Sequence, residues 1–273
     1  MGKVLITGAS GFVGRHLLRA LVAQGADVRA VLRPNAVEKV QTLAAIEVVE
    51  SPSPFSESET WWADALSGID TIVHLAWYAE PGKYLTAPEN LDCLTGTLTM
   101  AKAAAEVSVR RFVGVGTCFE YDVSVGTLSI ETPLKPLTPY AAAKAAAFIA
   151  LSQWLPAQSV EFAWCRLFYL YGEGEDERRF VPYLRKSLEA GQRADLTEGR
   201  QVRDFMDVRD AAARICEVTF GKATGAINVC SGVPVTVREL AERIADQYGR
   251  RDLLNFGARP DNLVDPPFVL GVP

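Results

Sequence analysis

The chain has 273 residues, 49% of them hydrophobic and 22% charged, which is enough to bury a large core and ordinary for a soluble globular protein. The formal net charge of -5 does not favour binding to nucleic acid. The sequence contains no apolar run of about 18 residues, so we expect no membrane-spanning helix. Five cysteines without a Cys-x-x-Cys pair and only two histidines argue against a disulfide or zinc framework, so we expect no metal and a cytoplasmic protein.

The first predicted element is a buried strand over Lys3–Thr7, which starts too early to leave room for a signal peptide. A glycine-rich turn follows, and leucines then recur at helical spacing until Gly25. Strand, glycine turn and helix are the context of a dinucleotide fingerprint. In such a turn Gly8 permits the tight bend, Gly11 lets the backbone approach a pyrophosphate, and Gly14 lets helix and strand pack closely. The N–H groups at the start of the helix would bind the phosphates.

The spacing of this turn is Gly-x-x-Gly-x-x-Gly within the run TGASGFVG. It resembles the opening motif of the extended branch of the short-chain dehydrogenase/reductase superfamily, a branch of nucleotide-sugar epimerases, dehydratases and reductases. The resemblance covers most of the chain. It implies an α/β fold, a Rossmann-type doubly wound parallel sheet of about seven strands with a smaller discontinuous substrate-binding lobe. In this motif it implies cofactor contacts from Thr7, Gly8, Ser10, Gly11, Phe12, Val13 and Gly14.

The end of the second predicted strand, Val28–Leu32, bears on the choice of cofactor. Members that bind NAD need a carboxylate there for the ribose hydroxyls, and this chain has Arg33 instead. A guanidinium suits a 2′-phosphate, so NADP(H) is favoured and NAD(H) remains an alternative. Arg29 is a weaker second candidate for the same role. After the third strand, Ile46–Glu50, no aspartate stands where the branch meets the adenine, and that contact is left open.

The fourth predicted strand, Thr71–Ala76, resembles the strand whose end passes beside the cofactor in this branch, which implies contacts from Leu75 and Ala76. The histidine in this strand, His74, is expected to be a structural spacer and not a catalytic base. A long helix is predicted next, over residues 90–107. The family pattern Asn-x-x-Gly-Thr puts Cys93 where an asparagine is usual, and Asn90, one turn earlier, is a candidate substitute.

The fifth predicted strand, Arg111–Gly116, leads into Thr117 and Tyr121, which occupy the places of the family's serine or threonine and of its following tyrosine. The resemblance implies that the Thr117 hydroxyl hydrogen-bonds the reacting oxygen. The 4,6-dehydratases of the branch carry Asp-Glu directly after the threonine, whereas Cys118 and Phe119 cannot shuttle protons as carboxylates do. The bifunctional epimerase–reductases use a cysteine at the place of Phe119 and a distal histidine, both missing here. Neither chemistry is expected.

Tyr140 and Lys144 lie four residues apart in an alanine-rich run, Pro139–Leu155, which predicts a helix that Pro156 ends. At this spacing their side chains share one face of the helix. A phenol titrates near ~10, and a neighbouring ammonium lowers that pKa, so the pair predicts an acid–base device at a carbonyl or alcohol. The resemblance implies that Lys144 also holds the nicotinamide ribose.

The substrate lobe is predicted from a further set of likenesses. A sixth strand, Phe162–Leu170, leads into a Tyr-Gly signature; Phe180 begins a helix; and residues 201–210 resemble the Arg-Asp-Phe-x-x-Val-x-Asp segment. In relatives, arginines at the places of Arg203 and Arg259, the latter within Gly257–Asp261, hold the substrate diphosphate. The dinucleotide-binding domain is predicted over 1–170 and 206–231, and the lobe over 171–205 and 232–273. The candidate substrate-binding residues are Thr117, Cys118, Phe119, Tyr169, Phe180, Val181, Arg203 and Arg259.

These expectations combine into NADPH-dependent reduction of a 4-keto-6-deoxy nucleotide sugar, with hydride delivered to C4 and Tyr140 as proton donor. The partner is a nucleotide-diphosphate sugar, in the making of deoxysugar precursors. One alternative is an NAD-dependent 4-epimerase. Another is a non-catalytic NADP(H)-binding regulator, against which the intact Thr117, Tyr140 and Lys144 argue. A homodimer is expected through the helices at 90–107 and 141–155, where Ala145 and Ala146 would allow close approach.

Overall fold

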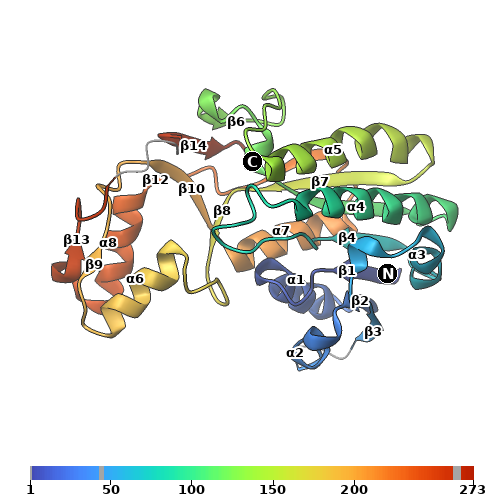
Figure 1. Ribbon diagram of the computed structural model, residues 1–273, viewed down its shortest axis with the longest axis horizontal. Coiled ribbons are helices and arrows are strands. Elements are labelled where there is room, and N and C mark those ends of the chain that lie inside the picture. Colours follow the sequence, from blue (N-terminus) through green and yellow to red (C-terminus); the bar gives the residue numbers. More distant parts are fainter. Residues whose placement is uncertain (1, 43–45, 261–265) are drawn as a thin grey trace.

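A seven-stranded parallel sheet forms the centre of the chain, in a computed structural model that describes residues 2–42, 46–260 and 266–273 (Figure 1). The strand order is β3-β2-β1-β4-β5-β7-β11, so the order reverses between β1 and β4, where ligands bind in doubly wound sheets. This confirms the predicted fold class. The strands are β1 (Val4–Thr7), β2 (Val28–Leu32), β3 (Glu47–Glu50), β4 (Thr71–His74), β5 (Arg111–Thr117), β7 (Glu161–Leu167) and β11 (Gly225–Val229).

Helices cover both faces of this sheet, which explains why its central strands are continuous apolar runs and not alternating ones. On one face α1 (Phe12–Ala23), α2 (Val37–Gln41) and α7 (Val208–Phe220) pack over one apolar cluster. On the other face α3 (Glu59–Ala65), α4 (Glu89–Glu106) and α5 (Pro139–Ala157) pack over a second cluster, with α4 and α5 side by side (Figure 1). Short 3₁₀ turns are η1 (Pro34–Ala36), η2 (Pro54–Ser56), η3 (Cys118–Glu120), η4 (Val123–Val125) and η5 (Arg251–Leu253).

A second lobe lies beyond the ends of β7 and β11, at the left of Figure 1. Its main sheet has the order β12-β10-β14-β6, with β8 paired to β10, and β13 pairs with β9. One of these strands, β6, comes from the range predicted for the dinucleotide-binding domain. Residues 261–265 of the predicted lobe lie outside the described residues. The elements are β6 (Thr127–Leu128), β8 (Tyr169–Tyr171), α6 (Phe180–Glu189), β9 (Ala194–Asp195), β10 (Val202–Asp207), β12 (Pro234–Thr236), α8 (Val237–Tyr248), β13 (Leu254–Asn255) and β14 (Phe268–Gly271).

Two predicted boundaries are wrong. The strand predicted over Phe162–Leu170 is two strands that separate at Phe168, because β7 stays in the central sheet while β8 pairs with β10 of the second lobe. Pro156 does not end α5, which continues through Ala157. A proline in the last turn removes one hydrogen bond, and the Gln158 N–H still closes the helix on the Leu155 carbonyl at 2.9 Å.

All five cysteines are buried and unpaired. Within the described ranges, no group of three or more His, Cys, Asp or Glu side chains is arranged to hold a metal ion. The helices of the described residues include none that is both long and apolar enough to cross a membrane.

Candidate active site

The glycine-rich turn between β1 and α1 is shaped by close backbone contacts. Gly8 has a φ of 75°, and a Cβ there would lie 2.7 Å from the Ala76 nitrogen at the end of β4. A Cβ on Gly14 would overlap the Gly8 carbonyl, so this position needs glycine for helix–strand packing. A Cβ on Gly11 would meet only the Gly8 oxygen, at 3.2 Å, and Gly11 is exposed. The side of the turn at Gly11 is therefore the open one.

The start of α1 fits a dinucleotide pyrophosphate. Its N-cap is Gly11, which has no side chain to cap the helix, and the first turn carries no acidic residue. The leading N–H groups of this helix therefore have no side-chain cap, and the helix dipole favours an anion beside them. Ser10, Phe12 and Val13 are half-buried around the same turn.

The two glycines make separable predictions. Gly14→Ala should lower the melting temperature of the protein without added cofactor, because the new methyl group collides with backbone. Gly11→Ala should leave that melting temperature close to wild type and weaken nicotinamide dinucleotide binding instead. Thermal melting with and without cofactor measures both. Equal loss of stability in both variants would contradict the assignment of the open side.

A chain of hydrogen bonds joins β1, β4 and α4 beneath the turn. The Ala76 N–H donates to Thr7 Oγ1 at 3.2 Å. The Thr97 hydroxyl donates to the Cys93 carbonyl at 2.7 Å, so it accepts from His74 Nε2, 2.9 Å away. The other nitrogen of the neutral ring, Nδ1, then accepts from the Thr7 hydroxyl at 2.8 Å. Burial lowers the pKa of His74 to about 3, which keeps it neutral. The prediction that His74 is a structural spacer is confirmed.

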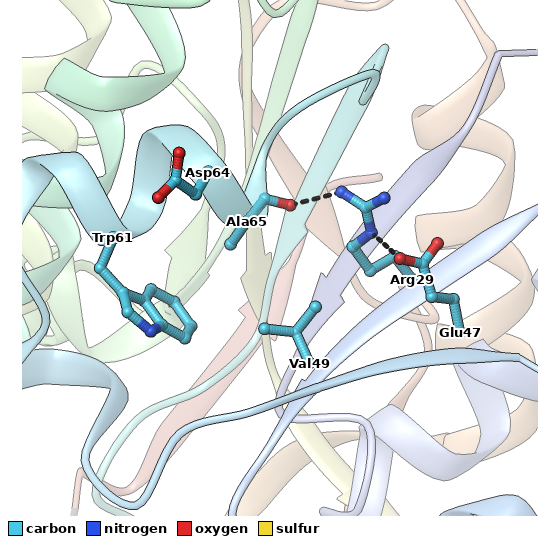
Figure 2. A pocket seen from close by; sticks show the side chains of 6 residues that line it. All are labelled: Arg29, Glu47, Val49, Trp61, Asp64 and Ala65. Carbon is cyan, nitrogen blue, oxygen red and sulfur yellow. Dashed lines mark hydrogen bonds and ion pairs between the residues drawn. The ribbon is translucent and has the colours of Figure 1, made fainter.

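The two arginines considered for binding the 2′-phosphate lie at opposite ends of β2. Arg33 is exposed just beyond the C-terminal end of β2, and the glycine turn follows the same end of the parallel strand β1. Arg29 is wrong as a second candidate, because its guanidinium bonds Glu47 at 2.8 Å and the Ala65 carbonyl at 2.7 Å, near the C-terminus of α3. Figure 2 shows these two bonds. The pocket around them has a volume of about 310 Å³ and lies at the start of β2 and β3, at the opposite end of the strands from the glycine turn. That pocket is lined by Arg29, Glu47, Val49, Trp61, Asp64 and Ala65.

The candidate catalytic side chains converge where β5 and α5 meet. Thr117 ends β5, and Tyr140 lies in the first turn of α5, which Thr138 caps by accepting the Ala141 N–H at 3.2 Å. The Thr117 hydroxyl lies near the Tyr140 phenol and lowers its pKa in part, against the larger effect of burial. Lys144, one turn along, is buried and donates to the Val115 carbonyl at 2.6 Å. The structure therefore brings together the three residues predicted from the sequence.

The predicted lowering of the Tyr140 pKa is wrong for the chain by itself. Burial, followed by Tyr84 and Glu120, raises the pKa of Tyr140 above its ordinary value. Burial also lowers the pKa of Lys144 to about 7, so near neutral pH this lysine is charged only part of the time, unlike an exposed lysine. Sequence spacing gave the shared face correctly but carried no information on burial.

The buried ion pair between Glu120 and Arg166 fixes the backbone at Thr117, and the sequence did not predict it. The Glu120 carboxylate, fully buried, accepts from the Thr117 N–H at 2.8 Å, from Trp164 Nε1 at 3.0 Å and from Arg166 Nε at 2.7 Å. Arg166 Nη1 also donates to the Tyr121 hydroxyl at 2.9 Å. A signal was present in the sequence: alternate glycines in a buried strand leave room for large side chains. A Cβ on either Gly114 or Gly116 would overlap the Trp164 ring.

The segment between β4 and α4 closes over this group, a second feature that the sequence analysis missed. Trp77 lies against Lys144, and Tyr84 packs edge-on against Tyr140. Asn90, the candidate substitute for the missing family asparagine, is fully buried and bonds Trp77 and not a reacting group. At the place of the usual asparagine, Cys93 accepts the Tyr78 N–H at 3.3 Å, and burial raises its pKa to about 11.

The candidate substrate residues fall into two groups. Phe119 packs edge-on against Tyr169 at 6.0 Å between ring centroids, and the buried Arg203 guanidinium lies 5.1 Å from the same Tyr169 ring. These three residues adjoin Thr117 through η3. Arg259 is separate, exposed over the Tyr183 ring of α6.

The remaining candidates are more enclosed. Cys118 and Val181 are buried in apolar clusters, and Phe180 is half-buried at the start of α6. Burial also raises the pKa of the Cys118 thiol, so it stays neutral. Asp261, which ends the predicted arginine segment, lies outside the described residues.

Known proteins resemble this chain along nearly its whole length. It is 25% identical over 98% of its residues to dTDP-6-deoxy-L-talose 4-dehydrogenase (NAD(+)) from Aggregatibacter actinomycetemcomitans, 99% of which is covered. It is 26% identical over 96% of its residues to CDP-abequose synthase from Salmonella muenchen, with 87% of that protein covered.

Solved structures share the fold. A UDP-N-acetylglucosamine 4-epimerase from Methanobrevibacter ruminantium M1 has a TM-score of 0.87 at 20% identity, over 99% of this chain and 89% of that one. MoeE5, solved with UDP-glucuronic acid and NAD, has a TM-score of 0.83 at 25% identity, over 99% and 90%. The model of the NAD dependent epimerase/dehydratase family matches residues 4–230. The chain therefore belongs to the NAD-dependent epimerase/dehydratase family of extended short-chain dehydrogenases/reductases.

Proposed function

We propose that this protein reduces a 4-keto-6-deoxy nucleotide sugar with NADPH. The observation that carries the proposal is the meeting of Thr117, Tyr140 and Lys144, with Tyr140 held as a neutral phenol by burial. Lys144 contacts Trp77, the residue after Ala76, against which Gly8 of the glycine turn packs. A proton donor to a carbonyl must be protonated at working pH, and the raised pKa of Tyr140 meets that need. Relatives named as a talose 4-dehydrogenase and as an abequose synthase support a nucleotide-sugar substrate.

Each side chain has a role that its position supports. The bound nicotinamide dinucleotide supplies the hydride to C4. Tyr140 donates its phenolic proton to the C4 oxygen as the carbonyl becomes an alcohol. Thr117 donates a hydrogen bond to the same carbonyl oxygen and so orients the sugar. Lys144 binds the nicotinamide ribose, and its ammonium stabilises the phenolate that forms after the proton leaves.

Dehydration chemistry lacks its acid–base groups. The two positions after Thr117 hold a neutral thiol and a phenyl ring, Cys118 and Phe119. The nearest carboxylate, Glu120, is fully buried and bonded to Arg166, so it faces no substrate. Both histidines are engaged elsewhere, since His74 bridges two threonines and His16 bonds the Glu173 carbonyl at 2.8 Å. These contacts favour simple carbonyl reduction.

We expect Arg33→Ala to raise the KM for NADPH by roughly 10-fold or more and to leave the KM for NADH within about twofold, because only NADPH carries the 2′-phosphate. The exposed position of Arg33, just after β2, supports this role. Steady-state kinetics with both cofactors test it, with Arg29→Ala as the matched control at the other end of β2. Equal effects of Arg33→Ala on both cofactors would contradict a contact between Arg33 and the 2′-phosphate.

The protein is expected to act as a homodimer through the outer faces of α4 and α5. Apart from the buried Lys144, α5 carries no charged residue, and its exposed positions include Ala142, Ile149 and Trp154. Ala146 is half-buried on this face, whereas Ala145 points inward and is 3% exposed, so it makes no contact with a partner.

Ile149→Glu should convert the dimer to a monomer, because it places a charge in the centre of an apolar interface. Light scattering at micromolar concentration measures the mass. Lys222→Glu, at an exposed position just after α7 on the opposite face of the sheet, is a control for the change in charge and should leave the dimer intact. A wild-type monomer at this concentration would remove the proposal.

A further inference from the structure

The segment that joins β4 to α4 places one aromatic ring on each of the two candidate catalytic side chains of α5. The Trp77 ring centroid lies 3.9 Å from Lys144 Nζ. The Tyr84 and Tyr140 rings pack edge to face, with centroids 4.9 Å apart and planes at 89°. The Leu85 carbonyl accepts the Tyr140 N–H at 3.1 Å, so the segment is also fixed to the backbone of α5.

One buried amide holds this segment. Asn90, fully buried in the first turn of α4, donates through Nδ2 to the Tyr84 carbonyl at 2.7 Å and to the Ala87 carbonyl at 2.8 Å. Its Oδ1 accepts from Trp77 Nε1 at 2.9 Å. Both donors and the acceptor of the amide are therefore used within one segment, and at this depth no water competes with them. The orientation of the indole is set by Asn90.

We propose that Asn90 and Trp77 are positioning residues for Lys144, with Asn90 fixing the indole and the indole face holding the lysine ammonium beside the cofactor site. The catalytic meaning of this inference rests on the proposed function. It gives a physical account of a departure from the family pattern, in which Cys93 stands in place of an asparagine. An amide is still used here, one turn earlier, and it acts on the lysine through an aromatic ring.

The pKa of Lys144 is close to neutral pH, so a contact with the Trp77 ring can decide whether this lysine is charged. Burial lowers its pKa to about 7, and Glu120, after β5, opposes that effect. The other titratable groups nearby are Cys93 on α4, His74 on β4 and Tyr140 on α5, all neutral at this pH. A tryptophan face attracts an ammonium most strongly when water is excluded. Loss of the ring therefore disfavours the charged form and lowers the pKa of Lys144.

The first test needs no cofactor. Tryptophan fluorescence of the protein alone should show an inflection near pH 7 as the ammonium over Trp77 loses its proton. The inflection should vanish in Lys144→Met. It should shrink strongly in Trp77→Phe, which keeps only the more distant Trp164 ring, 5.8 Å from Lys144 Nζ. Trp61→Phe, on α3, is the matched control and should retain it. Absence of a Lys144-dependent inflection in the wild type, or an inflection of undiminished amplitude in Trp77→Phe, would overturn the proposal.

The second test measures NADPH affinity against pH. Trp77→Leu keeps an apolar side chain over Lys144 but removes the π face, so binding should weaken at a pH about one unit lower than in wild type. Asn90→Leu should shift the curve in the same direction by a smaller amount. A curve for Trp77→Leu that coincides with wild type would contradict the positioning role. Failure of the wild type to bind either NADPH or NADH would defeat the proposed function alone, since the fluorescence titration still decides the inference.

Discussion

Tyr140→Phe is expected to lower kcat for a keto sugar nucleotide by ~10²–10⁴-fold and to leave the affinity for NADPH unchanged. The substitution removes only the phenolic hydroxyl. The ring can still pack against Tyr84, and the backbone bond to the Leu85 carbonyl does not depend on the side chain. Steady-state kinetics and a cofactor titration give the two quantities separately.

Two further variants serve as controls for the effect of Tyr140→Phe. Tyr248→Phe, on α8, loses a hydroxyl that bonds Glu189 far from the site and should keep wild-type turnover. Lys144→Ala should impair both turnover and cofactor affinity, because the same ammonium serves both. If Tyr140→Phe retains more than roughly a tenth of wild-type turnover, Tyr140 is not the general acid.

The second large effect concerns stability. Glu120→Ala is expected to lower the free energy of unfolding by ~3–5 kcal/mol, because it leaves the buried Arg166 guanidinium without its counter-charge. Arg166 is 1% exposed and its Nη2 already lacks a hydrogen-bond partner among the described residues, so water cannot replace the carboxylate without opening the core. Chemical denaturation at neutral pH measures the loss.

Glu120→Gln separates charge from shape. The amide oxygen can still accept from the Thr117 N–H and from Trp164, so the turn after β5 should keep its shape while the ion pair is lost. We expect an intermediate loss of stability. Asp252→Ala, which breaks an exposed pair with Arg250, is the control and should change stability little. A Glu120→Ala variant as stable as this control would contradict a structural role for the buried pair.

The central sheet and the cofactor turn were predictable because their signals are local. Short apolar runs gave the strands, and the constraints on Gly8 and Gly14 come from contacts within one strand–turn–helix unit. The three candidate catalytic residues came from family motifs at the ends of β5 and α5. Local spacing also placed Tyr140 and Lys144 on one helix face, as the structure has them.

The support around the site was not predictable, since it depends on how distant segments meet. In the sequence Glu120 has the pattern of an ordinary charge in a turn, and it is buried only because Arg166 and Trp164 of β7 lie against it. The pKa of Tyr140 was predicted with the wrong sign because sequence spacing says nothing of burial. Asn90 was recognised as an out-of-place amide, but its partner Trp77 lies in an irregular segment without a pattern.

The measurement that tests the reductase assignment most directly uses NADPH carrying deuterium at its hydride-donating carbon. The enzyme is incubated with a 4-keto-6-deoxy nucleotide sugar, and the product is read by mass spectrometry and proton NMR. We expect one deuterium at C4 of the product for each NADPH consumed. An enzyme that instead interconverts two sugars with no deuterium in either, and with no net consumption of NADPH, would be an epimerase and would contradict the account.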